Sequence, residues 1–135
     1  MKKTFQTYLL ITLLLSLPAS LPPAFAAEPT GLFEARQLWQ LFKENQDKAG
    51  QDLIGKTIDI QGVVVETGMS VYLTPNVRLS NSAGGQIFVT CVLPRSDTGL
   101  LSTFNAGEKV TMRGRVYRFS SNEYVVIKES HRVTK

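Results

Sequence analysis

Two stretches of the chain share one pattern of apolar and polar residues. Residues 55–64 have the sequence GKTIDIQGVV, and residues 107–116 have the sequence GEKVTMRGRV. Each begins with a glycine, alternates apolar and polar positions, and has a second glycine seven residues later. Alternation at every second residue predicts a half-buried β-strand, and a glycine on its apolar face marks a bend or a close backbone approach. The pattern therefore predicts two coiled strands of one small barrel, with Gly62 and Gly114 facing the core.

Further alternating or apolar runs complete a predicted set of five strands. The second strand is interrupted at Pro75, which cannot donate to a ladder and so indicates a bulge or a sheet edge. Turns are expected at residues 67–70, 81–85 and 120–122. The expected strands cover residues 57–66, 71–80, 86–93, 107–119 and 123–133.

Apolar residues at helical spacing predict a helix before the first strand. It runs from Leu32 to Asn45, with Thr30 as the expected N-cap and Glu34 placed early, where the helix dipole favours a negative charge. Trp39 and Phe42 lie on its apolar stripe. Such a stripe usually packs on a sheet, and the alternative is a platform for a ligand.

Two shorter segments are also expected to leave the extended conformation. Residues 45–54 are polar and have room for a short turn. Between the third and fourth strands, Ser96 or Asp97 is a suitable cap for a short helix. That helix would carry Leu100, Leu101 and Phe104, which could close one end of the barrel.

The resulting order is helix, three strands, short helix and two strands, which is the order of an oligonucleotide/oligosaccharide-binding (OB) fold. The fold class is thus mainly β, a five-stranded barrel with an N-terminal helix and a short helix between strands 3 and 4. Four parts of the chain match a known family, namely the first helix with Leu38 and Phe42, and residues 55–64, 87–91 and 107–116. On these parts the chain resembles the tRNA_anti-like family of exported bacterial OB-fold proteins, many of which are described as lipoproteins. A weaker resemblance is to the periplasmic bacterial OB-fold family.

The beginning of the chain has the anatomy of a secretory signal peptide. Lys2 and Lys3 precede the apolar run 8–17, prolines end that run, and the A-x-A sequence at residues 24–26 follows. The run is well short of the roughly 20 residues that a membrane-spanning helix needs. We therefore expect cleavage after residue 26, leaving residues 27–135 as a single OB-fold domain in the periplasm or secreted. No cysteine stands at the cleavage site, so we expect no lipid or membrane anchor.

Charge gives little information about the partner. Two of the 15 Lys and Arg residues lie in residues 1–26, which leaves 13 against 11 acidic residues, a net charge of +2. A charge this small gives no general argument for nucleic acid binding.

Motifs for catalysis or metal binding are missing from the sequence. His131 is the only histidine, and neither H-x-x-x-H, C-x-x-C nor G-x-S-x-G occurs. Cys91, the only cysteine, lies in an apolar run and is expected to be a buried strand residue. A reactive thiol or an intermolecular disulfide is the alternative. We expect no enzyme activity, no cofactor and no metal.

A candidate binding surface follows from the fourth strand. Arg113, Arg115 and Tyr117 alternate with expected core residues, so they share an outward face. Tyr72 and Arg78 could extend this surface, together with Arg118, Tyr124 and Lys128. Guanidinium groups pair with phosphate or carboxylate, and aromatic rings stack on bases or sugars. The alternative is that these arginines keep an exposed strand soluble and block edge pairing.

The sequence favours a non-enzymatic, exported binding module that takes part in protein interaction or assembly in the bacterial cell envelope. The alternative is a module that binds single-stranded nucleic acid or another anionic polymer. The loops expected to border an OB-fold binding face, residues 67–70 and 120–123, are short, so a long single strand would be held weakly.

Overall fold

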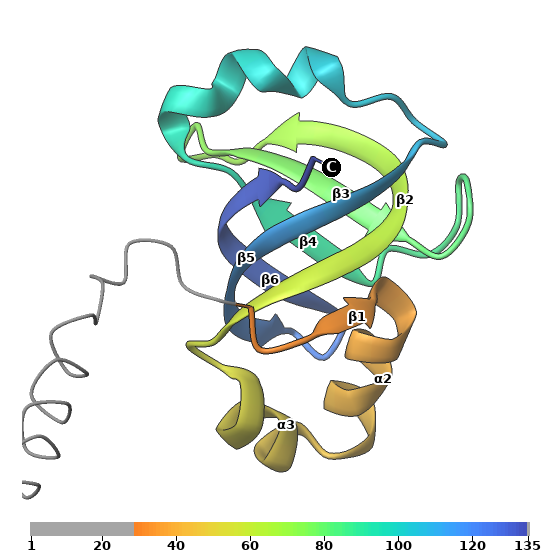
Figure 1. The fold of residues 1–135 in the computed structure, drawn as a ribbon, viewed down its shortest axis with the longest axis vertical. Coiled ribbons are helices and arrows are strands. Elements are labelled where there is room, and N and C mark those ends of the chain that lie inside the picture. Colours follow the sequence, from red (N-terminus) through yellow and green to blue (C-terminus); the bar gives the residue numbers. More distant parts are fainter. Residues whose placement is uncertain (1–28, 135) are drawn as a thin grey trace, which may run out of the picture.

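The computed structural model describes residues 29–134, and the expected signal peptide with its cleavage site lies outside them. Within this range, five strands form a barrel, and helical segments lie at its two ends (Figure 1). The elements in chain order are β1 (Leu32–Glu34), α2 (Ala35–Glu44), α3 (Gln46–Leu53), β2 (Thr57–Met69), β3 (Pro75–Ser80), β4 (Val89–Val92), the 3-10 helix η3 (Arg95–Thr103), β5 (Lys109–Ser120) and β6 (Tyr124–Arg132).

The sheet closes on itself. Its strand order is β1-β2-β3-β4-β6-β5, and β2 also pairs with β5. β4 and β6 are parallel, β1 and β2 are parallel, and the other pairs are antiparallel. The predicted fold class, a mainly β five-stranded OB-fold barrel with added helices, is confirmed.

The two glycine-led stretches pair with each other, which the pattern alone did not indicate. Residues 57–63 of β2 run antiparallel to residues 109–115 of β5. Gly55 and Gly107 both have positive φ values, +90° and +89°. The Gly55 N–H donates to the Val116 carbonyl at 2.8 Å, and the Gly107 N–H donates to the Val64 carbonyl at 2.8 Å. Each positive-φ glycine therefore turns the chain into one end of the same two-stranded ladder.

Gly62 and Gly114 are buried on the inner face of these strands, as predicted. A Cβ at Gly62 would lie 3.0 Å from the Ser80 carbonyl oxygen. A Cβ at Gly114 would lie 2.5 Å from Ile127 Cγ2 and 2.8 Å from the Lys128 carbonyl oxygen. The β5 backbone can approach β6 this closely only because residue 114 has no side chain.

The first hairpin differs from the prediction. β2 continues to Met69, with a bulge near residue 65, and the turn is formed by residues 70–74 instead of 67–70. Ser70 organises this turn, because its Oγ accepts hydrogen bonds from the Tyr72 and Thr74 amides at 3.1 and 3.2 Å. Pro75 then begins β3, a position where a missing N–H is tolerated. Residues 71–74 are consequently not a strand.

The first helix begins later than predicted. Residues 32–34 form β1, which pairs with β2, and α2 starts at Ala35. Its N-cap is Glu34 and not Thr30, because Glu34 and Gln37 form a reciprocal capping box. The expected short turn at residues 45–54 is a second helix, α3, capped by Asn45, whose side chain accepts from the Lys48 amide at 3.1 Å.

Between β4 and β5 the expected short helix is the 3-10 helix η3. Leu101 packs against the core and Phe104 is buried, so both help to close this end of the barrel as predicted. Leu100 does not, because its side chain is 49% exposed. β4 is also shorter than the predicted 86–93 and covers only four residues.

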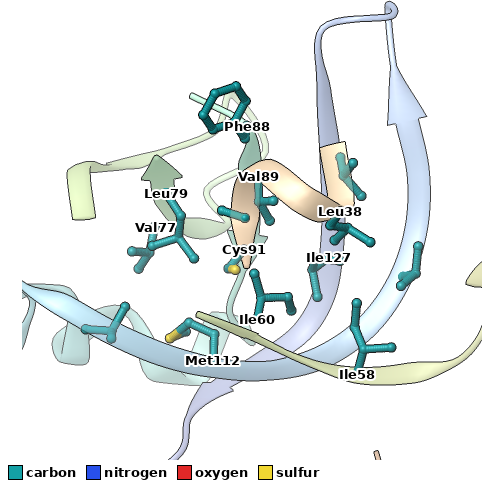
Figure 2. Packing of buried hydrophobic residues seen from close by; sticks show 14 of the residues in the cluster. Leu38, Ile58, Ile60, Val77, Leu79, Phe88, Val89, Cys91, Met112 and Ile127 are labelled. Carbon is teal, nitrogen blue, oxygen red and sulfur yellow. The ribbon is translucent and has the colours of Figure 1, made fainter. Parts of the chain in front are cut away.

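One apolar core fills the barrel and extends under α2. Figure 2 shows Ile60, Val77, Cys91 and Met112 converging from four different strands. Cys91 is fully buried, which confirms the expected strand position. Burial raises the pKa of this thiol to about 12, against a small lowering from a Ser130 hydrogen bond, so the thiol is protonated at neutral pH.

Candidate functional site

A groove of about 560 Å³ crosses the outer face of β3, β4, β5 and β6 and ends at the turn of residues 70–74. Its walls carry three cations and three tyrosines and contain no carboxylate. These six side chains are Tyr72, Arg78, Tyr117, Arg118, Tyr124 and Lys128. An OB fold typically binds ligands across the corresponding strands and the two flanking loops.

One ring of this groove, that of Tyr117, contacts two cations. Lys128 Nζ lies 3.7 Å from the centroid of the Tyr117 ring, and Arg118 Cζ lies 5.6 Å from it. Within residues 29–134, neither cation forms an ion pair with a carboxylate. Cation–π contacts orient the two groups without neutralising their charge. Arg118 and Lys128 therefore present full positive charges to the groove.

A bulge in β5 brings Tyr117 and Arg118 to the same side. The ladder with β6 shifts register between Val116 and Arg118, and residues 117 and 118 are both exposed. Strict alternation from Arg113 would have turned Arg118 into the core. The bulge is what makes it part of the groove.

The other side of the groove is formed by β3 and the preceding turn. Arg78 lies on β3, and its guanidinium is bound to Glu66 at 2.8 Å. Tyr72 projects from the turn and is 75% exposed. The Arg95 guanidinium donates to the Tyr72 carbonyl at 2.9 Å and ties the turn to η3. Tyr72 is thus an open stacking surface on a braced turn.

Asn76 lies at the bottom of the groove. It is only 5% exposed, and its Oδ1 has no hydrogen-bond partner among the described residues. An unsatisfied buried acceptor costs about 1–3 kcal/mol.

Arg113 and Arg115, the first two predicted site residues, do not line the groove. Arg113 makes two hydrogen bonds to Asp59, from Nε to Oδ1 at 2.7 Å and from Nη2 to Oδ2 at 3.0 Å. Arg115 lies opposite Lys128 in the ladder, and its Nε donates to Glu129 at 2.7 Å. The structure therefore brings together Tyr72, Arg78 and Tyr117 but leaves these two arginines in ion pairs beside the groove.

The part of the alternative in which these arginines block edge pairing is wrong. Over residues 109–115, β5 is hydrogen-bonded to β2 on one side, and β6 lies on its other side. Because the barrel is closed, this strand presents no free edge.

Of the two aromatic residues proposed as a platform on α2, only Trp39 is accessible. Phe42 is 1% exposed, and its ring stacks on Phe119 with centroids 5.6 Å apart. Trp39 is partly buried against Phe88, with centroids 5.0 Å apart. Phe42 is accordingly a core residue and not a platform.

Within residues 29–134, no three His, Cys, Asp or Glu residues gather as a metal site. His131, the only histidine, is exposed on β6. No helix in the described part of the chain is long and apolar enough to cross a membrane.

Comparison with known proteins agrees with this architecture. No curated protein matches the chain. A candidate nucleic acid-binding lipoprotein from Klebsiella pneumoniae subsp. pneumoniae MGH 78578 has a similar structure, with a TM-score of 0.63 and 18% identity. The match covers 84% of this chain and 100% of that protein. A candidate aspartyl-tRNA synthetase from Leishmania major Friedlin matches with a TM-score of 0.49 and 13% identity over 92% of this chain and 26% of the synthetase. The tRNA_anti-like family model matches residues 6–131, so the chain belongs to the tRNA_anti-like family.

Proposed function

We propose that the protein is a non-enzymatic binding module that holds single-stranded nucleic acid in the groove over β3, β4, β5 and β6. The observation that carries this proposal is the composition of the groove, which has three cations, three tyrosines and no carboxylate. Phosphate groups would pair with Arg118 and Lys128, because these two of the three groove cations form no ion pair with a carboxylate of the described residues. Unpaired bases would stack on Tyr72 and Tyr124.

The tyrosines narrow the class of ligand. A ligand that only carried negative charge would need cations alone, whereas a single strand also offers flat bases to aromatic rings. The name of the Klebsiella lipoprotein supports the same class of ligand. Among the two classes that the sequence left open, the geometry supports nucleic acid better than a protein of the cell envelope.

Export to the periplasm or the medium is part of this proposal. It is supported by the basic start, short apolar run and A-x-A sequence of residues 1–26 and by the naming of the similar Klebsiella protein as a lipoprotein. A nucleic acid ligand in that compartment would be a single strand that is entering or leaving the cell.

The proposal is tested by titrating fluorescently labelled oligonucleotides with the mature protein at several salt concentrations. We expect single strands to bind with an affinity that falls linearly on a log–log plot against salt. A duplex of the same sequence should bind more weakly, because its bases are not available for stacking. No binding at low salt would overturn the proposal. If inorganic polyphosphate competed as well as an unlabelled oligonucleotide, the ligand class would be anionic polymers in general and not nucleic acid.

A protein partner in the envelope is the second candidate, and one observation favours it. Val71 and Leu73, beside Tyr72 in the first turn, are 89% and 66% exposed. Leu73 also has φ of +61°, a conformation that branched side chains rarely adopt. Such an apolar tip could insert into a partner. Retention of one envelope protein at high salt, lost in a Val71→Ser/Leu73→Ser variant, would favour this candidate.

A further inference from the structure

A second hollow adjoins the groove on the side of α2. It has a volume of about 460 Å³ and shares Arg78, Thr90 and Tyr124 with the groove. Its remaining walls come from α2, from the segment before β4 and from the loop between β5 and β6. A single strand of nucleic acid bound in the groove could therefore continue into this hollow without leaving the protein surface.

The aromatic wall of the hollow is Trp39, whose ring is held from several sides. Its Nε1 donates to the Glu123 carbonyl at 2.8 Å, and its ring packs on Phe88 at a tilt of 52°. Lys43 Nζ lies 5.7 Å from the ring centroid. The side chain is nevertheless only partly buried, so part of a fixed indole remains accessible to a flat ligand.

The hydrogen-bonding groups of the hollow differ from those of the groove. Gln86 and Asn122 supply amides, Lys43 supplies an ammonium group, and Glu123 supplies a carboxylate. Within residues 29–134, the Glu123 carboxylate forms no ion pair. A carboxylate repels phosphate but accepts a hydrogen bond from the amino group of a base.

The loop that carries Glu123 has an unusual backbone. Ser121 and Asn122 have φ of +51° and +59°, and the Glu123 amide donates to the Ser120 carbonyl at 2.8 Å. This tight turn places Glu123 beside Trp39, which in turn holds its carbonyl. The indole ring and the backbone of Glu123 are thus held together before any ligand arrives, and the Glu123 side chain starts beside the ring.

We propose that this hollow is a base-selecting subsite, which takes one nucleobase against Trp39 and favours a base that bears an amino group bonded by Glu123. The inference rests on the proposed function. The groove then supplies affinity through phosphates and stacking without sequence preference, and the hollow supplies selectivity at one nucleotide.

The first experiment uses Trp39 as the reporter, because it is the only tryptophan in the chain. Oligo(dC) is added to the mature protein while its intrinsic tryptophan fluorescence and the anisotropy of a label on the oligonucleotide are followed together. We expect quenching of Trp39 with the same midpoint as the anisotropy change. Binding by anisotropy without any change at Trp39 would overturn the subsite and leave the proposed function standing.

The second experiment compares oligo(dC) with oligo(dU) of equal length, since uracil has a carbonyl where cytosine has its amino group. We expect oligo(dC) to bind roughly tenfold more tightly. Glu123→Gln should abolish the preference, because an amide both donates and accepts. Glu44→Gln is the control, since it removes an exposed carboxylate from α2 outside both hollows.

The outcomes separate the two proposals. Equal binding of oligo(dC) and oligo(dU) by the wild type, or a preference that survives Glu123→Gln, would overturn the subsite. Loss of the preference in Glu44→Gln would also overturn it, because the effect would then be one of net charge. No binding of either oligonucleotide would overturn the proposed function itself, and the subsite with it.

Discussion

The outer surface of the barrel carries two neighbouring pairs of cations whose surroundings differ. Arg113 and Arg115 on β5 are each bound to a carboxylate, Asp59 and Glu129 respectively. Arg118 and Lys128, a few residues away on β5 and β6, lie against the ring of Tyr117 and form no ion pair among the described residues. The first pair is called the paired arginines below, and the second pair is called the groove cations.

The difference shows that a cation's position on an exposed strand does not tell whether it can bind a ligand. Asp59 lies directly opposite Arg113 in the ladder, so this guanidinium is already occupied in a two-point contact. A phosphate would have to displace that carboxylate. The groove cations need no such exchange, and their charges are available at once.

Both surfaces depend on the close contact of β5 with β6, so the largest effect is expected from Gly114→Val. The Cβ of the new valine would already lie 2.8 Å from the Lys128 carbonyl oxygen. This oxygen cannot move without shifting the ladder between β5 and β6. We expect a loss of about 3 kcal/mol in the free energy of unfolding, measured by urea denaturation. Gly62→Val should cost less, because the nearest contacts there are 3.0–3.2 Å. Unchanged stability of the Gly114 variant would mean that this register is wrong.

Removing the groove cations should have the largest effect on binding. An Arg118→Ser/Lys128→Ser variant should bind single strands at least about tenfold more weakly, because a hydrogen bond to a charged group contributes about 1.5 kcal/mol or more. Its stability should stay within about 0.5 kcal/mol of the wild type, as for other surface changes. Fluorescence anisotropy measures the affinity, and urea denaturation measures the stability. An undiminished affinity would show that the ligand does not bind in the groove.

Removing the paired arginines should leave the affinity nearly unchanged. In an Arg113→Ser/Arg115→Ser variant we expect a loss of stability of about 1 kcal/mol, since Asp59 loses its two hydrogen bonds. The same titration and denaturation experiments apply. A loss of affinity as large as that of the groove variant would remove the distinction between the two pairs.

The smallest effect concerns the ion pair at the other end of β6, where Arg132 binds Glu108 at 3.1 Å. The Asn105 amide and then Arg132 hold the pKa of Glu108 below its ordinary value. Because the folded-state pKa is lowered, this carboxylate stabilises the fold above its unfolded pKa, and the contribution disappears as the pH falls through the folded-state pKa. As the pH is lowered, the free energy of unfolding of Glu108→Gln, measured by urea denaturation, should fall slightly less than that of the wild type. An identical dependence on pH in the two proteins would contradict this.

The barrel was predictable because its strands carry their own periodicity. Gly62 and Gly114, seven residues after their leading glycines, indicated bent core strands, and both are buried against neighbouring backbone or side chains. The helix start was misplaced because the apolar Leu32 fits both a helical stripe and β1. The spacing of Glu34 and Gln37, a capping box, is the local signal that could have corrected it.

The candidate site was only partly predictable, because its key features are not local. Asp59 and Arg113 are 54 residues apart in sequence, and only the ladder register brings them together. The bulge that turns Arg118 outward contains no glycine or proline from which the sequence could have predicted it. Tyr72 and Arg78 were identified correctly as neighbours of Tyr117, although the turn that carries Tyr72 was expected to be a strand.

The salt dependence of single-strand binding, measured side by side for the groove variant, the paired-arginine variant and the wild type, tests the central claim most directly. Both variants remove two positive charges, so net charge is matched. We expect the log–log slope of the groove variant to fall by roughly 0.7 for each phosphate that the variant no longer binds, and the slope of the paired-arginine variant to equal that of the wild type. A reduced slope for the paired-arginine variant with an unchanged slope for the groove variant would contradict the account.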